Sequence, residues 1–322
     1  MRSRLTGIDD LNRRALRAAL DTARSLGIEC HDPVVMKDSY NAVIHLRPSP
    51  VVARVATLTG LVRVDVEEHI RREIAVVDYL AASSAAAAVA PPTCTIPPGP
   101  YESEGLWLSL WEYIPHTPRE RPADAEVAPR LAQLHGLLRG YSGPSVPLDA
   151  AFDDLDRLVA LLGEAPVPSP ADVNLLGSEM ARARAGLAAA RTDHPQALHG
   201  DPHAGNMLVT PGGTVWVDFE ETCVGPVEWD LACLTYRHSD PGHLVDRYVE
   251  AGRHRMRDKV HARGDTARQT NCNVDALLPF IGARWVEAVA WTSYLAIHRP
   301  DRRKDAEGFA REWLDWLRRR GG

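Results

Sequence analysis

Cysteine is scarce in this sequence of 322 residues, and the few cysteines present show no paired spacing. There are five of them, an odd number, and no two stand in a C-x-x-C arrangement. Disulfide frameworks and zinc ribbons depend on paired spacings, so the sequence indicates neither. We therefore expect reduced, partly buried thiols, as in a cytoplasmic protein. The cysteines are Cys30, Cys94, Cys223, Cys233 and Cys272.

Long apolar runs are missing as well. A membrane-spanning helix needs about 18 or more consecutive apolar residues, and the longest apolar stretches here are interrupted well before that length. The first ten residues, MRSRLTGIDD, are polar and lack the apolar core of a secretion signal. We expect a cytoplasmic protein without a membrane partner.

The sequence also has no excess of basic residues. Lysine and arginine together number 37, aspartate and glutamate 43, and the formal net charge is −6. A protein that grips nucleic acid over a broad surface carries a basic footprint, so we expect no nucleic-acid partner. With 45% hydrophobic and 25% charged residues, the composition is typical of a folded protein with a sizeable core.

Hydrophobic periodicity divides the chain into a mixed first section and a mainly helical remainder, with a boundary near Ile114. The first section is expected to hold a helix over 11–26, an antiparallel hairpin of strands 40–46 and 51–56, a helix over 66–80, a loop over 81–100 and a strand over 106–113. Further helices are expected around 127–138, 155–162, 285–295 and 309–317. This length suits about two domains, or one large domain of two lobes.

The most informative stretch is HGDPHAGNMLVT at 199–210, followed by PGG and then TVWVDFE at 214–220. Two β-prone runs around Pro-Gly-Gly predict a β-hairpin. If its turn is centred on Gly212, Asn206 faces Asp218 across the hairpin, with Cβ atoms about 5 Å apart.

An amide oxygen and a carboxylate brought together in this way offer hard oxygen ligands. Mg²⁺ suits such a pair, because it takes few protein ligands and leaves room for substrate phosphates. Asp201 lies on the loop that enters the hairpin, so a second carboxylate is near the metal without needing to ligate it. That carboxylate is free to act on a hydroxyl.

Two other interpretations of the same stretch stay open. His199, Asp201 and His203 form an H-x-D-x-H pattern, which is compatible with the transition-metal cluster of a hydrolase. No further histidine or carboxylate follows at ligand spacing, however. A plain polar turn before a hairpin is the second alternative, but it gives no reason for an aspartate opposite Asn206.

The hairpin resembles the catalytic segment of the aminoglycoside phosphotransferase family, whose pattern is H-G-D-x-x-x-x-N followed by a strand and an Asp. Protein kinases use H-R-D-x-x-x-x-N and D-F-G in the same roles. The resemblance implies an α+β, protein-kinase-like fold of two lobes. Residues 1–113 would form a small N-lobe with an N-terminal helix and an antiparallel β-sheet that binds nucleotide. Residues 114–322 would form a mainly helical C-lobe with the catalytic loop and the substrate site.

Carried over residue by residue, the resemblance makes Asp201 the catalytic base and Asn206 and Asp218 the Mg²⁺ ligands. His203 stands where many protein kinases have a lysine that faces the transferred phosphate, so it is a second catalytic candidate. The segment GPVEWDLA at 225–232 also resembles the family, and there Asp230 is expected to brace the catalytic loop.

The N-terminal section supplies candidates for the nucleotide phosphates. Arg54, in the run VVARV, occupies the position of the phosphate-pairing lysine in the V-A-I-K strand of kinases, and Glu73 on the following helix is its expected ion-pair partner. A guanidinium can hold phosphate with two hydrogen bonds. Taken alone, the two residues would more often be solvated surface charges.

The turn that should cover the phosphates, MKDSYN at 36–41, contains no glycine, although backbone amides approach phosphate most easily where no Cβ intervenes. Ser39 and Asn41 could donate side-chain hydrogen bonds instead, and an ordinary hairpin end is the alternative. No Walker or G-x-G-x-x-G motif is present. By resemblance to the family's hinge, the Trp111 carbonyl and the Tyr113 amide would hydrogen-bond adenine, and Leu110 would line the pocket.

These observations favour an ATP-dependent, Mg²⁺-dependent phosphotransferase that moves the γ-phosphoryl group to a hydroxyl of a small molecule. An aminoglycoside or amino sugar is the favoured acceptor, and choline or ethanolamine, a sugar or homoserine are alternatives that the family includes. A polycationic acceptor should meet clustered acids, yet from Pro226 onward 14 acidic residues stand against 17 basic ones. A local acidic patch from Glu228, Asp240, Asp246, Glu250 or Glu287 could still exist.

Alternatives of another class are a nucleotide-binding pseudokinase and the metallohydrolase described above. A protein substrate is less expected, because DFE replaces D-F-G and Asp230 follows Asp218 too soon for a long activation segment. Glu220 could contact substrate or a second metal, or be solvated. The sequence does not give the oligomeric state.

Overall fold

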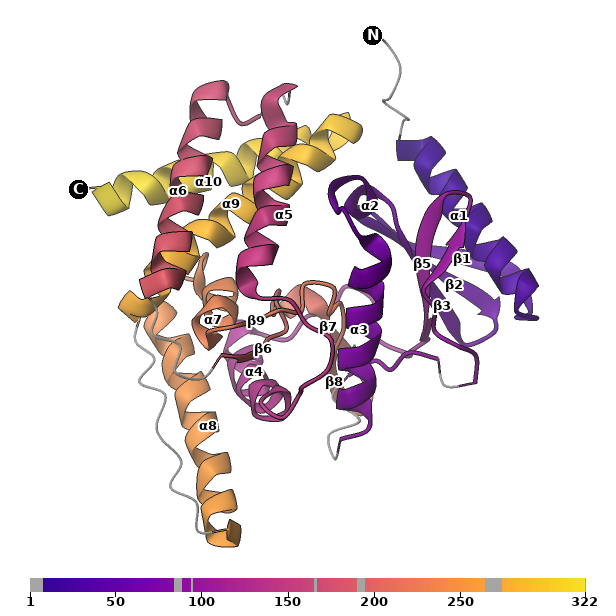
Figure 1. The fold of residues 1–322 in the computed structure, drawn as a ribbon, viewed down its shortest axis with the longest axis horizontal. Coiled ribbons are helices and arrows are strands. Elements are labelled where there is room, and N and C mark those ends of the chain that lie inside the picture. Colours follow the sequence, from indigo (N-terminus) through magenta and orange to yellow (C-terminus); the bar gives the residue numbers. More distant parts are fainter. Residues whose placement is uncertain are drawn as a thin grey trace.

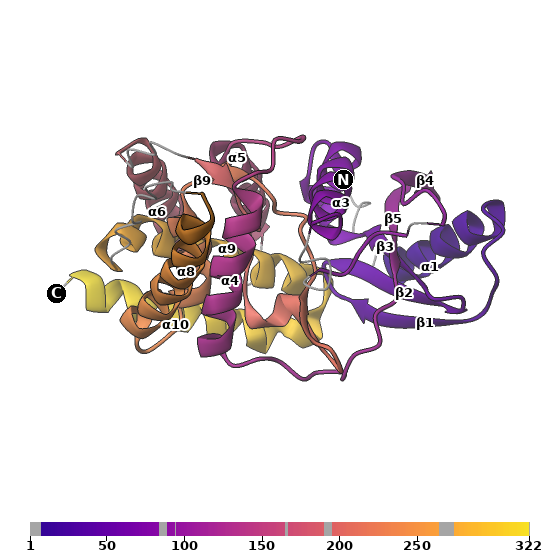
Figure 2. The same ribbon diagram turned by 90° about the horizontal axis from the view of Figure 1, so that it is seen from below.

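The computed structural model describes residues 8–83, 89–93, 95–164, 167–189, 195–263 and 274–321. They form a small lobe built on a β-sheet and a larger lobe of helices, which lie side by side (Figures 1 and 2). The α+β, two-lobed architecture predicted from the sequence is confirmed. Of the five cysteines, Cys30, Cys223 and Cys233 are free, whereas Cys94 and Cys272 lie outside the described residues. None of the helices in these ranges is long and apolar enough to cross a membrane.

The small lobe is an antiparallel sheet of five strands in the order β1-β2-β3-β5-β4. The predicted hairpin is present, with Asn41 opposite Ala56 and His45 opposite Val52. The strands are β1 (Cys30–Asp38), β2 (Asn41–Pro48), β3 (Val51–Ala56), β4 (Tyr101–Ser103) and β5 (Leu106–Glu112).

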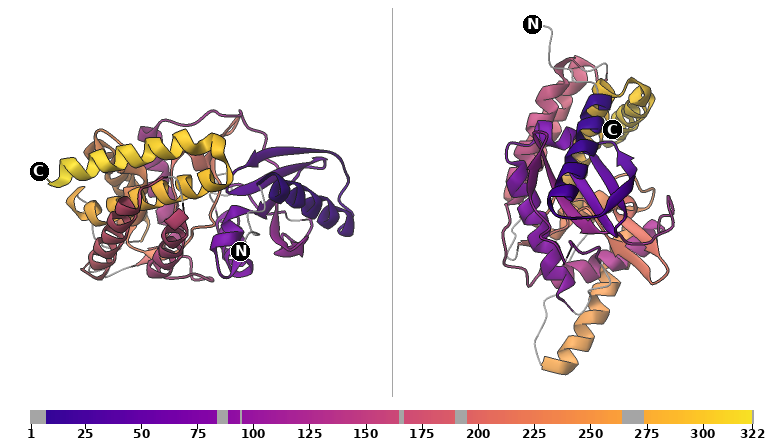
Figure 3. Two further views of the ribbon diagram at one scale, coloured as in Figure 1. Left: turned by 90° about the horizontal axis from the view of Figure 1, so that it is seen from above. Right: turned by 90° about the vertical axis from the view of Figure 1, so that its right-hand side faces the viewer.

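Two longer helices pack on opposite sides of this sheet (Figures 1 and 3). Helix α1 (Ile8–Ser25) lies across one face, where its buried alanines and Leu11 allow a close approach to the strands. Helix α3 (Val66–Ala81) lies on the side of the helical lobe and contacts β5. The side chain of Asp65 caps the first turn of α3 by accepting from the Glu68 amide. A short helix, α2 (Leu58–Val62), precedes α3.

The larger lobe is organised around α9 (Val274–His298), which packs against α6, α7 and α10. Its sequence is apolar around most of its circumference, as expected for a helix surrounded by others. The other helices are α4 (Asp124–Leu138), α5 (Leu148–Ala160), α6 (Pro170–Ala189), α7 (Val227–Thr235), α8 (Pro241–Arg263) and α10 (Arg303–Gly321). Between α6 and α7 the chain forms the short strands β6 (Gln196–Ala197), β7 (Met207–Thr210), β8 (Gly213–Trp216) and β9 (Val224–Gly225).

Some elements were not expected from the sequence. Strand β1 is a half-exposed edge strand with Pro33 and two register irregularities, so it lacks the regular alternation that would have revealed it. Helix α6 buries only Leu176, Glu179, Met180 and Ala183, which makes its apolar stripe too thin to stand out. Strand β4 has three residues and helix α2 has five, so each is too short to show a hydrophobic period.

Candidate active site

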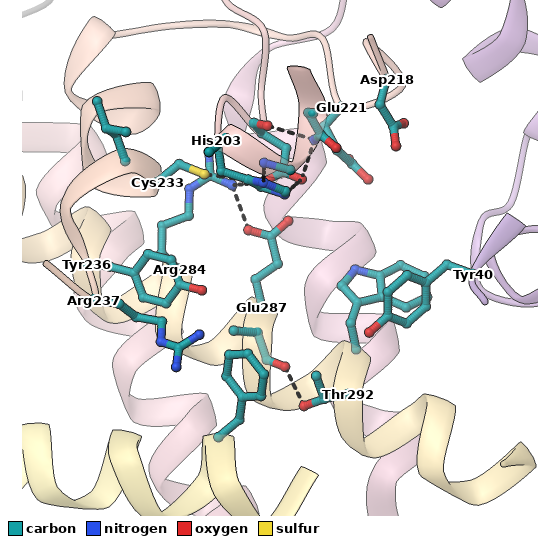
Figure 4. A pocket seen from close by; sticks show the side chains of 18 of the residues that line it. Tyr40, His203, Asp218, Glu221, Cys233, Tyr236, Arg237, Arg284, Glu287 and Thr292 are labelled. Carbon is teal, nitrogen blue, oxygen red and sulfur yellow. Dashed lines mark hydrogen bonds and ion pairs between the residues drawn. The ribbon is translucent and has the colours of Figure 1, made fainter. Parts of the chain in front are cut away.

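A cavity of about 910 Å³ lies between the two lobes. Its walls come from the turn after β1, the loop at 199–206, the segment after β8 and one face of α9 (Figure 4). The four residues predicted as catalytic groups or metal ligands line this cavity. They are Asp201, His203, Asn206 and Asp218.

The pairing of the hairpin differs by one residue from the prediction. Thr210 faces Gly213, and Met207 faces Trp216. The prediction that Asn206 faces Asp218 across the strands is therefore wrong, because Asn206 stands opposite Val217, whose amide donates to the Asn206 carbonyl over 3.0 Å. Pro211 and Gly212 form the turn, and Gly213 after them takes a positive φ of 116°, the arrangement of a type I turn followed by a glycine bulge, which shifts the pairing by one residue.

Asn206 and Asp218 reach the same cavity by another route. Asn206 ends a short 3-10 helix, η3 (Ala204–Asn206), before β7 begins. Asp218 follows the end of β8 and has a positive φ of 69°, a left-handed conformation that Asp tolerates better than most residues. The turn at Asp218 takes its side chain out of the strand alternation and into the cavity shared with Asn206.

The hydrogen bonds of Asn206 fix which of its atoms is left for a metal. Its Nδ2 donates to the carbonyl of Asp201 over 2.9 Å and to Oδ2 of Asp201 over 3.0 Å. Both partners are acceptors, so the amide nitrogen must face them and Oδ1 is the oxygen left over. With the carboxylate of Asp218, this oxygen forms a donor set that fits a small, hard divalent cation.

Asp201 lies among donors and cations. Oδ2 is 3.3 Å from Nε2 of His203, and Oδ1 accepts from the Cys233 thiol over 3.2 Å and lies 3.9 Å from Nη1 of Arg284. Burial would raise the pKa of Asp201, but His203 and Arg284 outweigh it and hold the pKa well below its usual range. The carboxylate is therefore ionised at neutral pH and can accept a hydrogen bond from a hydroxyl.

Asp230 holds the loop that carries Asp201 through hydrogen bonds to its backbone, as expected. The buried carboxylate of Asp230 accepts from the amides of His199 and Gly200 over 2.9 and 3.0 Å, and from Nε2 of His135 over 2.9 Å. Gly200 has a φ of +91°, and a Cβ at this position would lie 1.9 Å from the Glu221 carbonyl oxygen. Only glycine fits there.

The predicted ion pair between Arg54 and Glu73 is present and lies inside a larger network. Nη1 of Arg54 donates to both carboxylate oxygens of Glu73, over 2.9 and 2.7 Å. Nη2 lies 2.5 Å from Asp218 and 2.8 Å from Glu220. Arg54 therefore joins α3 of the small lobe to the segment after β8.

Sequence reasoning missed Arg63 as a site residue. This buried side chain follows α2, pairs with Glu220 over 2.8 Å and also contacts Glu221. Glu220, which the sequence left undecided between metal, substrate and solvent, is thus held by Arg54 and Arg63. Because α2 was not predicted, nothing in the sequence distinguished Arg63 from a surface arginine.

Of the two polar side chains expected to face the phosphates from the turn after β1, Asn41 lines the main cavity and Ser39 does not. The amide nitrogen of Asn41 donates to Glu220 over 3.1 and 3.2 Å, and its oxygen accepts from the Thr59 hydroxyl, so the side chain is engaged by protein groups. Ser39 lines a different hollow, of about 460 Å³, beside α10. Lys37, which was not among the predicted phosphate contacts, lies 3.8 Å from Asp218 and lines the main cavity.

One of the predicted adenine contacts, the Tyr113 amide, is engaged within the protein. The Tyr113 amide donates to the Pro50 carbonyl over 2.9 Å, so this donor is used within the sheet. The ring of Tyr113 stacks on His45 with centroids 3.8 Å apart. Leu110 is fully buried in the core, and the indole of Trp111 donates to Ser109. None of the three belongs to the described residues that line the main cavity.

The histidine pattern does not form a metal cluster in the part of the chain that the structure describes. Both ring nitrogens of His199 are engaged, Nδ1 by the Asp201 amide and Nε2 by the Val217 carbonyl, each over 3.2 Å. Its ring packs against Phe219, with centroids 4.4 Å apart. Among those residues, no group of three or more His, Cys, Asp or Glu side chains is arranged to hold a metal ion.

The floor of the cavity combines a carboxylate with aromatic rings. Of the five acidic residues that could have formed a patch, only Glu287 of α9 lines the cavity. It pairs with Arg284 over 2.6 Å, and Figure 4 shows its carboxylate directed up toward the catalytic loop. Burial raises the pKa of Glu287 to about 7, although Arg284 opposes the shift. Tyr40 packs edge-on against Trp291, with centroids 5.3 Å apart.

Comparison with known proteins agrees with this geometry. The profile of the phosphotransferase enzyme family (APH) matches residues 42–263, which contain most of β2, the strands β3 to β9 and the loop with Asp201. The chain belongs to this family. It is accordingly an enzyme, a small-molecule phosphotransferase with a protein-kinase-like fold. No curated protein matches its sequence.

Several solved structures share the fold at low sequence identity. An amicoumacin kinase, hAmiN, solved with AMP-PNP, Ca²⁺ and amicoumacin, has a TM-score of 0.63 at 13% identity, over 95% of this chain and 96% of that one. A microcompartment-associated aminopropanol kinase has the same TM-score and identity, over 92% and 97%. The choline kinase LicA from Streptococcus pneumoniae has a TM-score of 0.56 at 12% identity, over 92% and 99%.

Proposed function

We propose that this phosphotransferase moves the γ-phosphoryl group of ATP to a hydroxyl of a small, amine-bearing acceptor, with an aminoglycoside or amino sugar favoured. The observation that carries the proposal is the position of Asp201. Its ionised carboxylate lines a cavity large enough for such an acceptor. It also accepts a hydrogen bond from Asn206, whose Oδ1, with the carboxylate of Asp218, suits a divalent cation.

Each residue around the phosphate has a proposed role. Asp201 orients the acceptor hydroxyl and accepts its proton. Asn206 and Asp218 would hold Mg²⁺, which neutralises phosphate charge when it is bound. Arg54 and Lys37, both next to Asp218, would pair with the phosphates, and the pair of Glu73 with Arg54 orients the guanidinium. His203 adds positive charge beside the transferred group.

The adenine contact has to be revised by one residue. Amides alternate in direction along an extended chain, and the Tyr113 amide points to Pro50 of the small lobe. We therefore propose the Ile114 amide as the hinge donor in place of the Tyr113 amide. Ser39 and Asn41 are not retained as phosphate contacts, since Ser39 lines another hollow and Asn41 is engaged by Glu220 and Thr59.

The preference for an amine rests on the floor of the cavity. Glu287 lines the cavity together with Trp291 and Tyr236 and so offers a carboxylate near aromatic side chains, a combination that suits an ammonium group. The same features favour a second candidate, a smaller amino alcohol of the choline or aminopropanol kind, because the structural neighbours include kinases named for such acceptors.

A substrate panel tests the proposal. Purified protein is incubated with Mg²⁺ and ATP and with aminoglycosides, amino sugars, amino alcohols or neutral sugars, and both ADP release and the phosphorylated product are measured. We expect transfer to at least one amine-bearing alcohol and little to neutral sugars. Nucleotide binding without transfer to any acceptor would instead indicate a pseudokinase, and transfer only to neutral sugars would contradict the amine preference.

A further inference from the structure

Arg284 is a buried arginine that packs directly against the catalytic loop and has no role in the proposed function above. From α9, its Nη2 donates to the carbonyl of Gly200 and lies 3.5 Å from the carbonyl of Trp229. Its guanidinium carbon lies 3.6 Å from the centre of the Trp229 ring. Nη1 pairs with Glu287 over 2.6 Å and lies 3.9 Å from Oδ1 of Asp201.

The residue before Asp201 is therefore held at both ends of its backbone by different helices. Asp230 of α7 accepts from the Gly200 amide, and Arg284 of α9 donates to the Gly200 carbonyl. The Gly200 N–H belongs to the peptide before this residue and its C=O to the peptide that joins it to Asp201, so the two contacts together fix the peptide planes on both sides of Gly200, and the second plane leads into Asp201. The direction of the Asp201 side chain depends on that plane.

Folding alone does not call for an arginine at this position. Arg284 is only 2% exposed, and its Nε has no hydrogen-bond partner among the described residues. Burying a cation and leaving a donor unpaired are both costly, and apolar replacement of a buried ion pair is often neutral or stabilising. Its other two nitrogens contact the Gly200 carbonyl and lie near Oδ1 of Asp201, so this arginine is placed to hold the catalytic loop.

We propose that Arg284 is a positioning residue for phosphoryl transfer. It holds the Gly200 carbonyl and faces Oδ1 of Asp201, so that the carboxylate meets the acceptor hydroxyl in a reactive orientation. This proposal rests on the proposed kinase function. Because orientation matters most in the transition state, loss of Arg284 lowers kcat and leaves the KM values for ATP and acceptor nearly unchanged.

The decisive comparison is between Glu287→Gln and the double variant Arg284→Met/Glu287→Gln. Both variants lack the carboxylate at position 287, so they differ only in the guanidinium of Arg284. Removing the guanidinium in this background does not leave a buried, unpaired Glu287 carboxylate. We expect the kcat of the double variant to lie about 100-fold below that of Glu287→Gln, the loss typical of a misplacement of about 1 Å. Arg284→Lys/Glu287→Gln should recover part of the lost kcat, since a lysine ammonium can still donate to the Gly200 carbonyl. It lacks the planar pair of donor nitrogens with which a guanidinium contacts two groups at once.

Arg184→Met is the matched control. Arg184 also pairs with carboxylates of the helical lobe, those of Asp149, Asp153 and Asp156, and also lies near an aromatic ring, Phe152, but it does not line the cavity. Its loss should leave kcat unchanged. Thermal unfolding and ATP binding of every variant separate folding from turnover.

Equal kcat values for Glu287→Gln and the double variant would overturn the proposal. The proposal would also be overturned if kcat fell in parallel with ATP binding and thermal stability and the lysine variant did not restore it. That result would mean that Arg284 only maintains the fold. If the methionine variant does not fold, the lysine variant is compared with Glu287→Gln instead, and a loss of kcat that is matched by equal losses of ATP binding and thermal stability refutes positioning. A wild-type protein that phosphorylates no acceptor would instead refute the proposed function.

Discussion

At the scale of single residues, the site is a set of charges that constrain one another. Asp201 has a lowered pKa because His203 and Arg284 outweigh its burial, and His203 has a raised pKa because Asp201 outweighs the opposing effect of burial. The hydrogen bond from Asn206 to Asp201 joins the proposed base to a proposed metal ligand. The carboxylate of Asp201 is thus held in the ionised form that its proposed role requires.

The first prediction concerns Asp201. Asp201→Asn keeps the shape of the side chain but removes the proton acceptor, so the transfer rate should fall by about 10²–10⁴-fold, the range of general base catalysis. ATP binding, measured by calorimetry, should stay nearly the same. Asp246→Asn, at an exposed position of α8, is the control. Transfer at the wild-type rate by Asp201→Asn would remove Asp201 from the mechanism.

The second prediction is a pH dependence. The positive charge of His203 persists to higher pH than usual and is lost as the pH rises through its raised pKa. Transfer should therefore decline over that range in the wild type, and His203→Gln should be slower but lack this decline. The ion pair stabilises the fold below pH about 6.5 and loses this contribution as the pH rises through the folded value. Identical pH profiles of the two proteins would refute the role.

At the scale of elements, long periodic segments were predictable and local geometry was not. Regular apolar spacing predicts several elements, and their buried faces agree with it: the helices α1, α3, α4 and α9 and the hairpin of β2 and β3. The register of the catalytic hairpin was wrong by one residue, because turn length cannot be read from Pro-Gly-Gly alone. The catalytic loop was identified by its motif, whereas Arg63 and Arg284 act through packing partners distant in sequence, which no local pattern shows.

The third prediction tests the packing of α6 on α9. A Cβ at Gly186 would lie 2.3 Å from Cβ of Pro279, a rigid partner on α9, so Gly186→Ala should destabilise the fold by about 1–3 kcal/mol. Gly177, on the same helix, has nothing within 4 Å of such an atom. Gly177→Ala should stabilise by about 0.5–1 kcal/mol through helix propensity. Denaturant unfolding measures both, and equal effects would contradict this packing.

At the scale of the whole molecule, a charge network joins the two lobes. Arg54 and Arg63 come from the sheet-bearing lobe, and Asp218, Glu220 and Glu221 follow β8 in the helical lobe. The cavity opens beside this network, and Tyr40 meets Trp291 across it. The relative position of the lobes, and with it the shape of the cavity, therefore depends on buried ion pairs.

The fourth prediction concerns this network. Arg63→Met leaves the carboxylates of Glu220 and Glu221 with one guanidinium fewer, and breaking a buried pair in this way should cost about 3–5 kcal/mol. Arg72, on α3, is also buried but lies 3.8 Å from its partner Glu68. Arg72→Met should change stability by about 1 kcal/mol or less. Comparable losses in both variants would show that the network does not hold the lobes.

The most direct test of the account is a crystal structure of the protein with Mg²⁺ and a non-hydrolysable ATP analogue. The account predicts a metal ion bound by Oδ1 of Asn206 and the carboxylate of Asp218, with the γ-phosphate on the side of the cavity that Asp201 lines. A metal bound elsewhere, or a nucleotide seated outside the cavity between the lobes, would contradict it.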